Sequence, residues 1–316
     1  MTTPLKIIFA GSSSFSEEPL KTLYDMQYEI VGVLTQPDKK QGRGLKSGPN
    51  KVKTLALDLG LKVLDIANLK TDKALLEIQS LKPDVILTAS YGNVLPEKIL
   101  NLATTETLNI HPSLLPKWRG ATPIQASILN GDKETGVSII RMIDKLDAGP
   151  IFISEKISIS DGENYQSLSN KLSLLSAEII RKHLEQILLG DMHPKEQQGE
   201  KASFCNKISK GDGEINWNKS AKEINRTIKA YNPWPIAYSY IDNKYLRLWD
   251  STISNSDLQS GVPGEVLALQ SEGVLIKTGS SNLLLKSLQL EGKKKMHALD
   301  FIKGFPMVGK VLGLKQ

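Results

Sequence analysis

The feature that most constrains the fold is a regular alternation of apolar runs and helical patterns between residues 5 and 159. Helical patterns occur at 19–26, 52–59, 72–81 and 123–129, and each separates short runs of the kind that form buried strands. Parallel strands need a crossover, usually a helix, so this rhythm predicts a Rossmann-like, open and mostly parallel sheet with helices on both faces. Its strands are expected at Leu5–Ala10, Ile30–Leu34, Lys62–Ile66, Asp84–Ala89, Thr107–Ile110, Val137–Ile143 and Ile151–Ile159.

The pattern changes after a long amphipathic helix that ends at Gly190. The next stretch, as far as Lys207, is polar and aperiodic, which is typical of a linker. Beyond Ser209 one helical pattern at 221–230 precedes five short strand-like runs, and this predicts a small OB-like β-barrel. The expected organisation is therefore an α/β domain over 1–190, a linker over 191–208 and a β domain over 209–316. The five runs are Ala237–Ile241, Tyr245–Ser254, Gly264–Leu269, Val274–Lys277 and Leu283–Leu290.

Length and composition limit the number of domains and the class of protein. A chain of 316 residues exceeds what one hydrophobic core usually serves, which agrees with two domains. No apolar run reaches the roughly 18–20 residues that span a bilayer, and the N-terminus lacks a signal-peptide pattern. The only cysteine is Cys205, and no His or Cys spacing resembles a metal site. We expect a cytoplasmic protein, monomeric, with no metal and no obligate protein partner.

Nearly all of the excess of positive over negative charge lies in the last third of the chain. From Ser209 onward there are 15 Lys and Arg against 10 Asp and Glu, whereas the preceding part is nearly balanced. A basic surface of this kind favours a polyanionic partner such as RNA, held through its phosphates. The alternative is a solvated basic surface with no ligand, and the same two interpretations apply to the run Lys293–Lys295.

The residues most suggestive of chemistry lie between Leu108 and Gly120. Asn109 and His111 alternate at the end of a predicted strand, so their side chains share one face of the sheet. In open parallel sheets, ligands bind beyond the carboxyl ends of the strands. Asp147 follows the next predicted strand in a turn-rich segment and can approach the pair. The alternative is that all three are ordinary loop and turn residues.

These residue types suit acyl transfer to an amine. The amide of Asn109 can donate to an oxyanion that develops on a carbonyl oxygen. His111 can share in that stabilisation or move protons, and Asp147 can orient the imidazole or a water. No Ser, Cys or Lys is clearly paired with a base at this predicted site, so direct transfer is favoured over a covalent enzyme intermediate.

The segment 108–151, beginning LNIHPSLLPKWRG and ending DAGPI, resembles the signature of the 10-formyltetrahydrofolate-dependent formyltransferases. The resemblance implies that Asn109, His111 and Asp147 are catalytic and that 10-formyltetrahydrofolate is the co-substrate. It also implies that two segments line the folate site. These are Ser113, Leu114, Leu115 and Pro116, and the run Ser90, Tyr91, Gly92, Asn93, Val94 and Leu95.

The amine acceptor depends on residues outside this signature. The segment TQPDKKQGRG at 35–44 is similar to an insertion in family members that formylate initiator methionyl-tRNA. The resemblance implies a tRNA-binding loop with Arg43, Lys39, Lys40 and Lys46 as its cations. An NPWP element at 232–235 also fits this branch, and we interpret it as a packing element. Two alternatives stay open: a sugar formyltransferase, and an RNA-binding protein without catalysis.

Overall fold

The computed structural model describes residues 4–41, 46–256 and 260–313, which form two compact units. Unit 1 consists of Met1–Pro123, Glu134–Ser158 and Leu168–Asn206. Unit 2 consists of Ile124–Lys133, Ile159–Ser167 and Lys207–Gln316. No helix among the described residues is long and apolar enough to cross a membrane.

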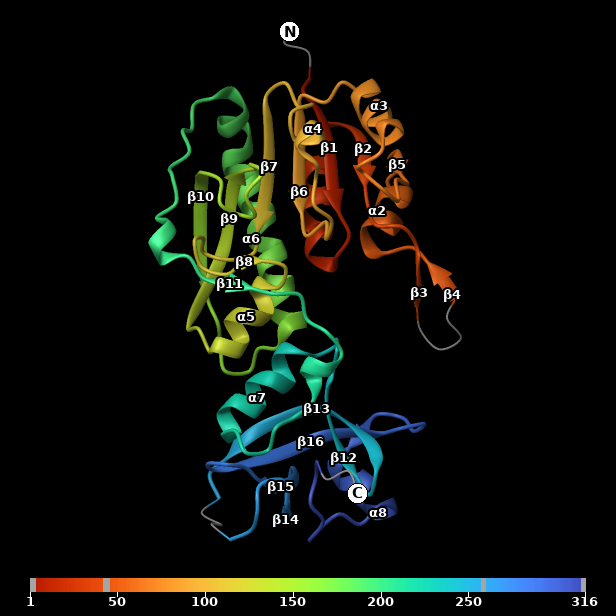
Figure 1. The fold of residues 1–316 in the computed structure, drawn as a ribbon, viewed down its shortest axis with the longest axis vertical. Coiled ribbons are helices and arrows are strands. Elements are labelled where there is room, and N and C mark those ends of the chain that lie inside the picture. Colours follow the sequence, from red (N-terminus) through yellow and green to blue (C-terminus); the bar gives the residue numbers. More distant parts are fainter. Residues whose placement is uncertain (1–3, 42–45, 257–259, 314–316) are drawn as a thin grey trace. The chain divides into compact units, whose positions relative to one another are not determined.

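Unit 1 is built on a seven-stranded sheet with the order β10-β9-β7-β6-β1-β2-β5 (Figure 1). The strands β7, β6, β1, β2 and β5 are parallel, and β9 and β10 extend the sheet in antiparallel fashion. This confirms the predicted mostly parallel sheet. The strands are β1 (Lys6–Gly11), β2 (Glu29–Leu34), β5 (Val63–Leu64), β6 (Val85–Ala89), β7 (Glu106–His111), β9 (Glu134–Arg141) and β10 (Ile151–Ser158).

Two-sided burial explains why the strand sequences are almost continuously apolar. Residues Ile7–Ala10 of β1 and Val85–Leu87 of β6 have no exposed surface, because helices cover both faces of a parallel sheet. Helix starts are fixed by side-chain caps: Asn50 accepts from the N–H of Lys53, and Thr71 from that of Ala74. The helices are α1 (Glu17–Asp25), α2 (Lys51–Asp58), α3 (Asp72–Ser80), α4 (Glu97–Leu100), α5 (Pro123–Asn130) and α6 (Tyr165–Leu189), with a short 3-10 turn η1 (Ser14–Ser16) before α1.

The strand order places a topological switch point at the carboxyl edge of β1. The chain proceeds from β1 to β2 and β5 on one side and then to β6 and β7 on the other. Loops that leave neighbouring parallel strands in opposite directions open a crevice at that edge. The loops after β1, β6 and β7 therefore surround the place where a ligand is expected.

A small hairpin interrupts the loop predicted over 36–50. Its strands are β3 (Lys39–Gln41) and β4 (Lys46–Gly48), and Arg43 lies outside the described residues. The base of the hairpin is tied to the sheet, because Asn50 Nδ2 donates to Thr35 Oγ1 (2.6 Å) and to the Gln36 carbonyl (3.0 Å). The N–H of Gln36 in turn donates to Ser12 Oγ at 3.0 Å.

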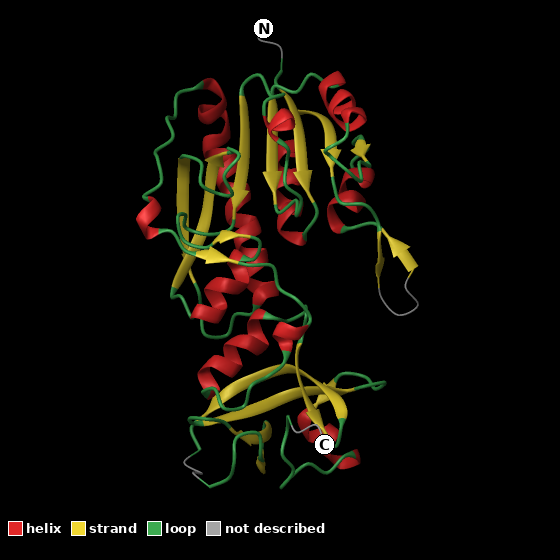
Figure 2. Ribbon diagram, viewed as in Figure 1, coloured by secondary structure: helices red, strands yellow, loops and turns green. Residues whose placement is uncertain are grey.

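Residues 191–206 pack on unit 1 instead of crossing solvent as a simple linker. The N–H groups of Ile151 and Lys195 each donate to the other residue's carbonyl at 2.8 Å. Strand β11 (Phe204–Cys205) pairs in parallel with β8 (Arg119–Gly120), and the 3-10 turn η2 (Gly199–Lys201) lies between these contacts (Figure 2). The sequence does not predict this arrangement, because a strand of two residues that pairs through its backbone shows no periodic pattern of apolar side chains.

Unit 2 contains an antiparallel sheet with the order β12-β13-β16-β15-β14, and β17 pairs with β16. The predicted small C-terminal β domain is thereby confirmed, and its helix α7 (Ala221–Ala230) begins at a capping box formed by Ser220 and Glu223. Helix α8 (Ala298–Gly304) was not predicted. The strands are β12 (Ala237–Ile241), β13 (Lys244–Ser254), β14 (Val266–Gln270), β15 (Gly273–Lys277), β16 (Asn282–Leu290) and β17 (Met296–His297), after the 3-10 turn η3 (Gly211–Gly213).

The core of unit 2 is formed by inward-facing strand residues, buried side chains of α7 and α8, and Trp217. Leu246, Leu248 and Leu288 are fully buried, and Trp217 Nε1 donates to Ser239 Oγ at 2.9 Å. The NPWP element contributes little to this core, since Trp234 is 51 % exposed. Our interpretation of Trp234 as a packing residue is therefore wrong for the side chain, although the neighbouring Tyr231 is buried.

Candidate active site

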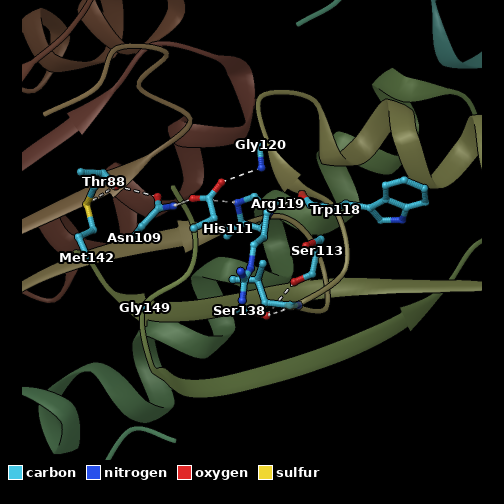
Figure 3. A network of polar contacts seen from close by, with 12 residues as sticks. Thr88, Asn109, His111, Ser113, Trp118, Arg119, Gly120, Ser138, Met142 and Gly149 are labelled. Carbon is cyan, nitrogen blue, oxygen red and sulfur yellow. Dashed lines mark hydrogen bonds and ion pairs between the residues drawn. The ribbon is translucent and has the colours of Figure 1, made fainter. Parts of the chain in front are cut away.

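The structure brings Asn109, His111 and Asp147 together at the carboxyl end of β7. Asn109 Nδ2 donates to Asp147 Oδ1 at 3.1 Å, and His111 Nδ1 lies 3.6 Å from the same oxygen. The Asn109 and His111 side chains converge with the backbone of Gly120 in Figure 3. Two residues of one strand and a third from the loop after β9 thus form a single polar cluster, as the sequence predicted.

Hydrogen bonds on both sides define the orientation of the Asn109 amide. Thr88 on β6 is its register partner, and Thr88 Oγ1 donates to Asn109 Oδ1 at 2.7 Å. The carboxylate of Asp147 can only accept, so the amide nitrogen faces Asp147 and the amide oxygen accepts from Thr88. An amide nitrogen carries two hydrogens, so Asn109 can bond Asp147 and still donate to a reacting oxygen.

The surroundings of His111 define its neutral tautomer. The ring is almost fully buried, and Nε2 lies 3.0 Å from the carbonyl oxygen of Trp118. A carbonyl oxygen can only accept, so Nε2 carries the hydrogen in the neutral ring. Nδ1 then has a free lone pair directed toward Asp147.

A strained turn presents the Asp147 carboxylate. The backbone of Asp147 has φ of 48°, in the left-handed region that non-glycine residues rarely adopt. Its Oδ2 accepts from the N–H of Gly120 at 2.8 Å, and its side chain is 10 % exposed. Two residues on, a Cβ on Gly149 would lie 1.9 Å from the carbonyl oxygen of Arg141, so only glycine fits.

Further hydrogen bonds, which the sequence did not predict, connect this turn to residues 195–206. Gln197 Nε2 donates to the carbonyls of Asp147 (2.9 Å) and Gly149 (2.7 Å). Its Oε1 accepts from Nε (3.0 Å) and Nη2 (2.7 Å) of the buried Arg119. No motif or periodicity marks Gln197 in the sequence. The burial of Arg119, which creates the need for an acceptor such as Gln197, is seen only in the structure.

The loop after β7 is rigidly built. Ser113 is fully buried, its hydroxyl donates to the Lys117 carbonyl at 2.6 Å, and its own carbonyl accepts from Ser138 Oγ at 2.8 Å. Ser138 Oγ also accepts from the N–H of Leu115 at 3.2 Å. The Ser113 side chain is thus used inside the loop, and Leu114 and Pro116 are half-buried beside it.

The loop after β6 is anchored by buried side chains at its two ends and is exposed in between. Tyr91 and Leu95 are each 4 % exposed, whereas Asn93 is exposed and Val94 is 80 % exposed. Gly92 has φ of 83°, and a Cβ there would meet Gln36 Nε2 at 2.5 Å. Ser90 also has a positive φ, so the backbone of this loop is tightly turned and its apolar tip faces outward.

The cysteine near the site is not activated. Burial raises the pKa of the Cys205 thiol, and the charge of Asp147 acts in the same direction. Its Sγ lies 3.4 Å from the Trp118 carbonyl, which a thiol can only approach as a donor. Nucleophilic catalysis needs a thiolate, so this geometry does not suit it. Among the described residues no group of three His, Cys, Asp or Glu side chains is placed to hold a metal.

Comparison with known proteins identifies the class. Residues 5–184 match the profile of the formyl transferase family, and residues 207–306 match that of its C-terminal domain. The chain belongs to the formyl transferase family, and it is a transferase. The first profile spans the strands of the seven-stranded sheet, and the second spans the strands of the antiparallel sheet.

Individual relatives narrow the class within the formyl transferase family. Methionyl-tRNA formyltransferase of Hydrogenovibrio crunogenus is 38 % identical over 99 % of this chain and 100 % of its own length. The enzyme of the same name from Marinobacter nauticus is 40 % identical over 95 % and 96 %. HypX from Aquifex aeolicus, solved with tetrahydrofolic acid, shares the fold with a TM-score of 0.64 and 18 % identity. That similarity covers 96 % of this chain and 48 % of HypX.

Proposed function

We propose that this protein transfers the formyl group of 10-formyltetrahydrofolate to the α-amino group of initiator methionyl-tRNA. The observation that carries the proposal is the Asn109, His111 and Asp147 cluster at the sheet edge where ligands bind. Full-length similarity to enzymes named methionyl-tRNA formyltransferase supports the acceptor. The three residues are proposed as catalytic.

The reaction is a direct transfer through a tetrahedral intermediate. The neutral amine attacks the formyl carbon, a new C–N bond forms, and the formyl oxygen becomes an oxyanion that accepts from Asn109 Nδ2. The ammonium proton passes to His111 Nδ1, where Asp147 stabilises the resulting imidazolium. Collapse of the intermediate breaks the bond to N10 of the folate, and the imidazolium of His111 gives its proton to N10.

The loops after β6 and β7 are proposed to hold the folate. Ser90–Leu95 offers backbone groups on a tight turn, and Leu114, Leu115 and Pro116 offer an apolar wall. Ser113 acts through the shape of its loop, because its hydroxyl and carbonyl are already bonded. Flat heteroaromatic ligands are commonly bound by such apolar surfaces with a few backbone hydrogen bonds.

The tRNA is proposed to bind through the hairpin and the C-terminal domain over 209–316. Lys39, Lys40 and Lys46 lie on the two hairpin strands, and Arg43 lies at the turn between them in sequence. The excess of positive charge beyond Ser209 supplies further phosphate contacts, with Lys293–Lys295 as one cluster. Catalysis is assigned to the domain over 1–190, extended by the contacts from residues 195–206.

The acceptor is tested by offering charged initiator tRNA, a UDP-amino sugar and no acceptor, each with 10-formyltetrahydrofolate. N-formylmethionine on the tRNA is the expected product. Formylation of the sugar alone would establish the sugar formyltransferase alternative. Saturable tRNA and folate binding with no formylated product would instead identify an RNA-binding protein without catalysis.

The role of the hairpin is tested with Arg43→Ala. We expect the KM for tRNA to rise several-fold, since one phosphate contact is removed, while the Kd for the folate stays unchanged. Lys73→Ala, which removes a charge from exposed helix α3, is the matched control. The KM for tRNA should also rise steeply with salt. Equal losses of tRNA and folate binding in Arg43→Ala would contradict the assignment.

A further inference from the structure

Gln197 is a half-buried side chain whose amide is fully used. Its two N–H groups donate to the carbonyls of Asp147 and Gly149, and its oxygen accepts twice from Arg119. An amide side chain can donate two hydrogen bonds and accept two, so no capacity remains for solvent or substrate. Such saturation is typical of a residue that fixes the position of its neighbours.

The contacts close a ring around the catalytic carboxylate. Arg119 reaches the backbone of Asp147 through Gln197, and the next residue, Gly120, donates its N–H to Asp147 Oδ2. The peptide at 119–120 therefore holds Asp147 twice, once at the carbonyl and once at the carboxylate. Strand pairing of β8 with β11, and the bond from the Arg119 N–H to the Ser203 carbonyl (2.9 Å), anchor that peptide.

The turn needs this support because its own conformation is unfavourable. A non-glycine side chain disfavours the left-handed region, so an unsupported Asp147 would relax. Relaxation would move Oδ1 away from Asn109 Nδ2 and from His111 Nδ1. Asp147 would still be present in the chain, but not at the distance that the chemistry requires.

We propose that Gln197 and Arg119 are positioning residues for Asp147, required for the rate of formyl transfer and not for the binding of either substrate. The inference rests on the proposed function, because it assigns Asp147 to the transfer step. Glutamine is required at 197 because it donates to two carbonyls and accepts from a guanidinium at once. Glutamate has the same size and would still accept from Arg119, but it would face both carbonyls with an oxygen.

The test compares Gln197→Glu and Gln197→Met with Gln198→Met, a matched control at the adjacent, exposed glutamine. We expect kcat to fall by roughly 10- to 100-fold in both Gln197 variants, the effect of a small displacement at a catalytic group. The KM for methionyl-tRNA and for 10-formyltetrahydrofolate should stay within about threefold, as expected when transition-state interactions alone are lost. Gln198→Met should retain the parental kcat.

A purely structural role predicts a different result. In that case Gln197→Glu, which retains the partner of Arg119, would keep its kcat within about threefold, and the proposal would be overturned. A fall in Gln198→Met as large as in Gln197→Met would also overturn it. Arg119→Met combined with Gln197→Met should be no slower than the worse single variant, because the two residues act as one unit.

A crystal structure of Gln197→Glu separates this inference from the proposed function. The distance from Asp147 Oδ1 to Asn109 Nδ2 should lengthen beyond hydrogen-bonding range. An unchanged distance would refute the positioning role, whatever the acceptor is. Failure of the parental enzyme to formylate methionyl-tRNA would refute the proposed function alone, and the crystallographic result would still decide the role of Gln197.

Discussion

Replacing Asp147 by asparagine changes one atom of a side chain that makes three polar contacts, and the cost can be worked out from their geometry. Oδ2 accepts from the N–H of Gly120 at 2.8 Å, and Oδ1 accepts from Asn109 Nδ2 at 3.1 Å. Asparagine has one acceptor oxygen. Whichever donor it satisfies, its own NH₂ group faces the other donor, so one bond is lost and the second loses its charge assistance.

Hydrogen bonds to a charged group contribute about 1.5–3 kcal/mol each, and neutral ones about 0.5–1.5 kcal/mol. Losing one charged bond and weakening the other therefore removes about 3–4 kcal/mol. If the transition state depends on this arrangement, kcat falls by roughly 100- to 1000-fold, at about 1.4 kcal/mol for each tenfold. The parental carboxylate also lies 3.6 Å from His111 Nδ1, and the loss of its negative charge should lower kcat further.

The assay is single-turnover formylation of methionyl-tRNA at saturating folate, with Asp144→Asn as the control. Asp144 is exposed on the same loop, so its replacement removes an equal charge without touching the cluster. Asp144→Asn should react at the parental rate. The reasoning fails if Asp147→Asn keeps more than about a tenth of the parental rate, because the contacts would then not matter in the transition state.

Three further predictions concern stability and pH. Gly149→Ala should lower the unfolding free energy by about 1–3 kcal/mol, because its Cβ would lie 1.9 Å from the Arg141 carbonyl oxygen. The control Gly162→Ala has open space around its Cβ, so its unfolding free energy should stay near the parental value in the same thermal melts. Burial raises the pKa of Tyr238 to about 12, so the unfolded chain ionises first and the unfolding free energy should fall as the pH rises from 10 to 12. In denaturant titrations Tyr238→Phe should flatten this pH dependence, and an unaltered slope would contradict the assignment. Trp217→Phe should lower the unfolding free energy by about 1–3 kcal/mol, because Ser239 Oγ would stay buried without its donor. Adding Ser239→Ala should recover part of that loss. Additive losses in the double variant would argue against the hydrogen bond as the cause.

The parts of the fold that the sequence predicted are those in which side-chain chemistry decides the structure. The apolar runs at β1, β6 and β7 are recognisable because both faces of a parallel sheet are buried. Asn109 and His111 could be paired because alternate residues of a strand share a face. Their meeting with Asp147 was predictable only as a proximity of loops, since the sequence does not specify the left-handed turn.

The parts that the sequence did not predict are built from backbone contacts. Strand β11 pairs through main-chain groups of two residues, and Gln197 is one of two adjacent glutamines in a polar stretch. No hydrophobic period marks either, so the segment has the composition of a linker. The same applies to the hairpin of β3 and β4, whose residues are those of a charged loop.

The contacts of residues 195–206 have a consequence for the order in which the site is assembled during synthesis. A nascent chain emerges N-terminus first, so β7 and the Asp147 turn leave the ribosome well before Gln197 and strand β11. Until that later segment arrives, the turn lacks the bonds to its backbone carbonyls. The full set of hydrogen bonds around Asp147 therefore forms only after residues 195–206 have emerged from the ribosome.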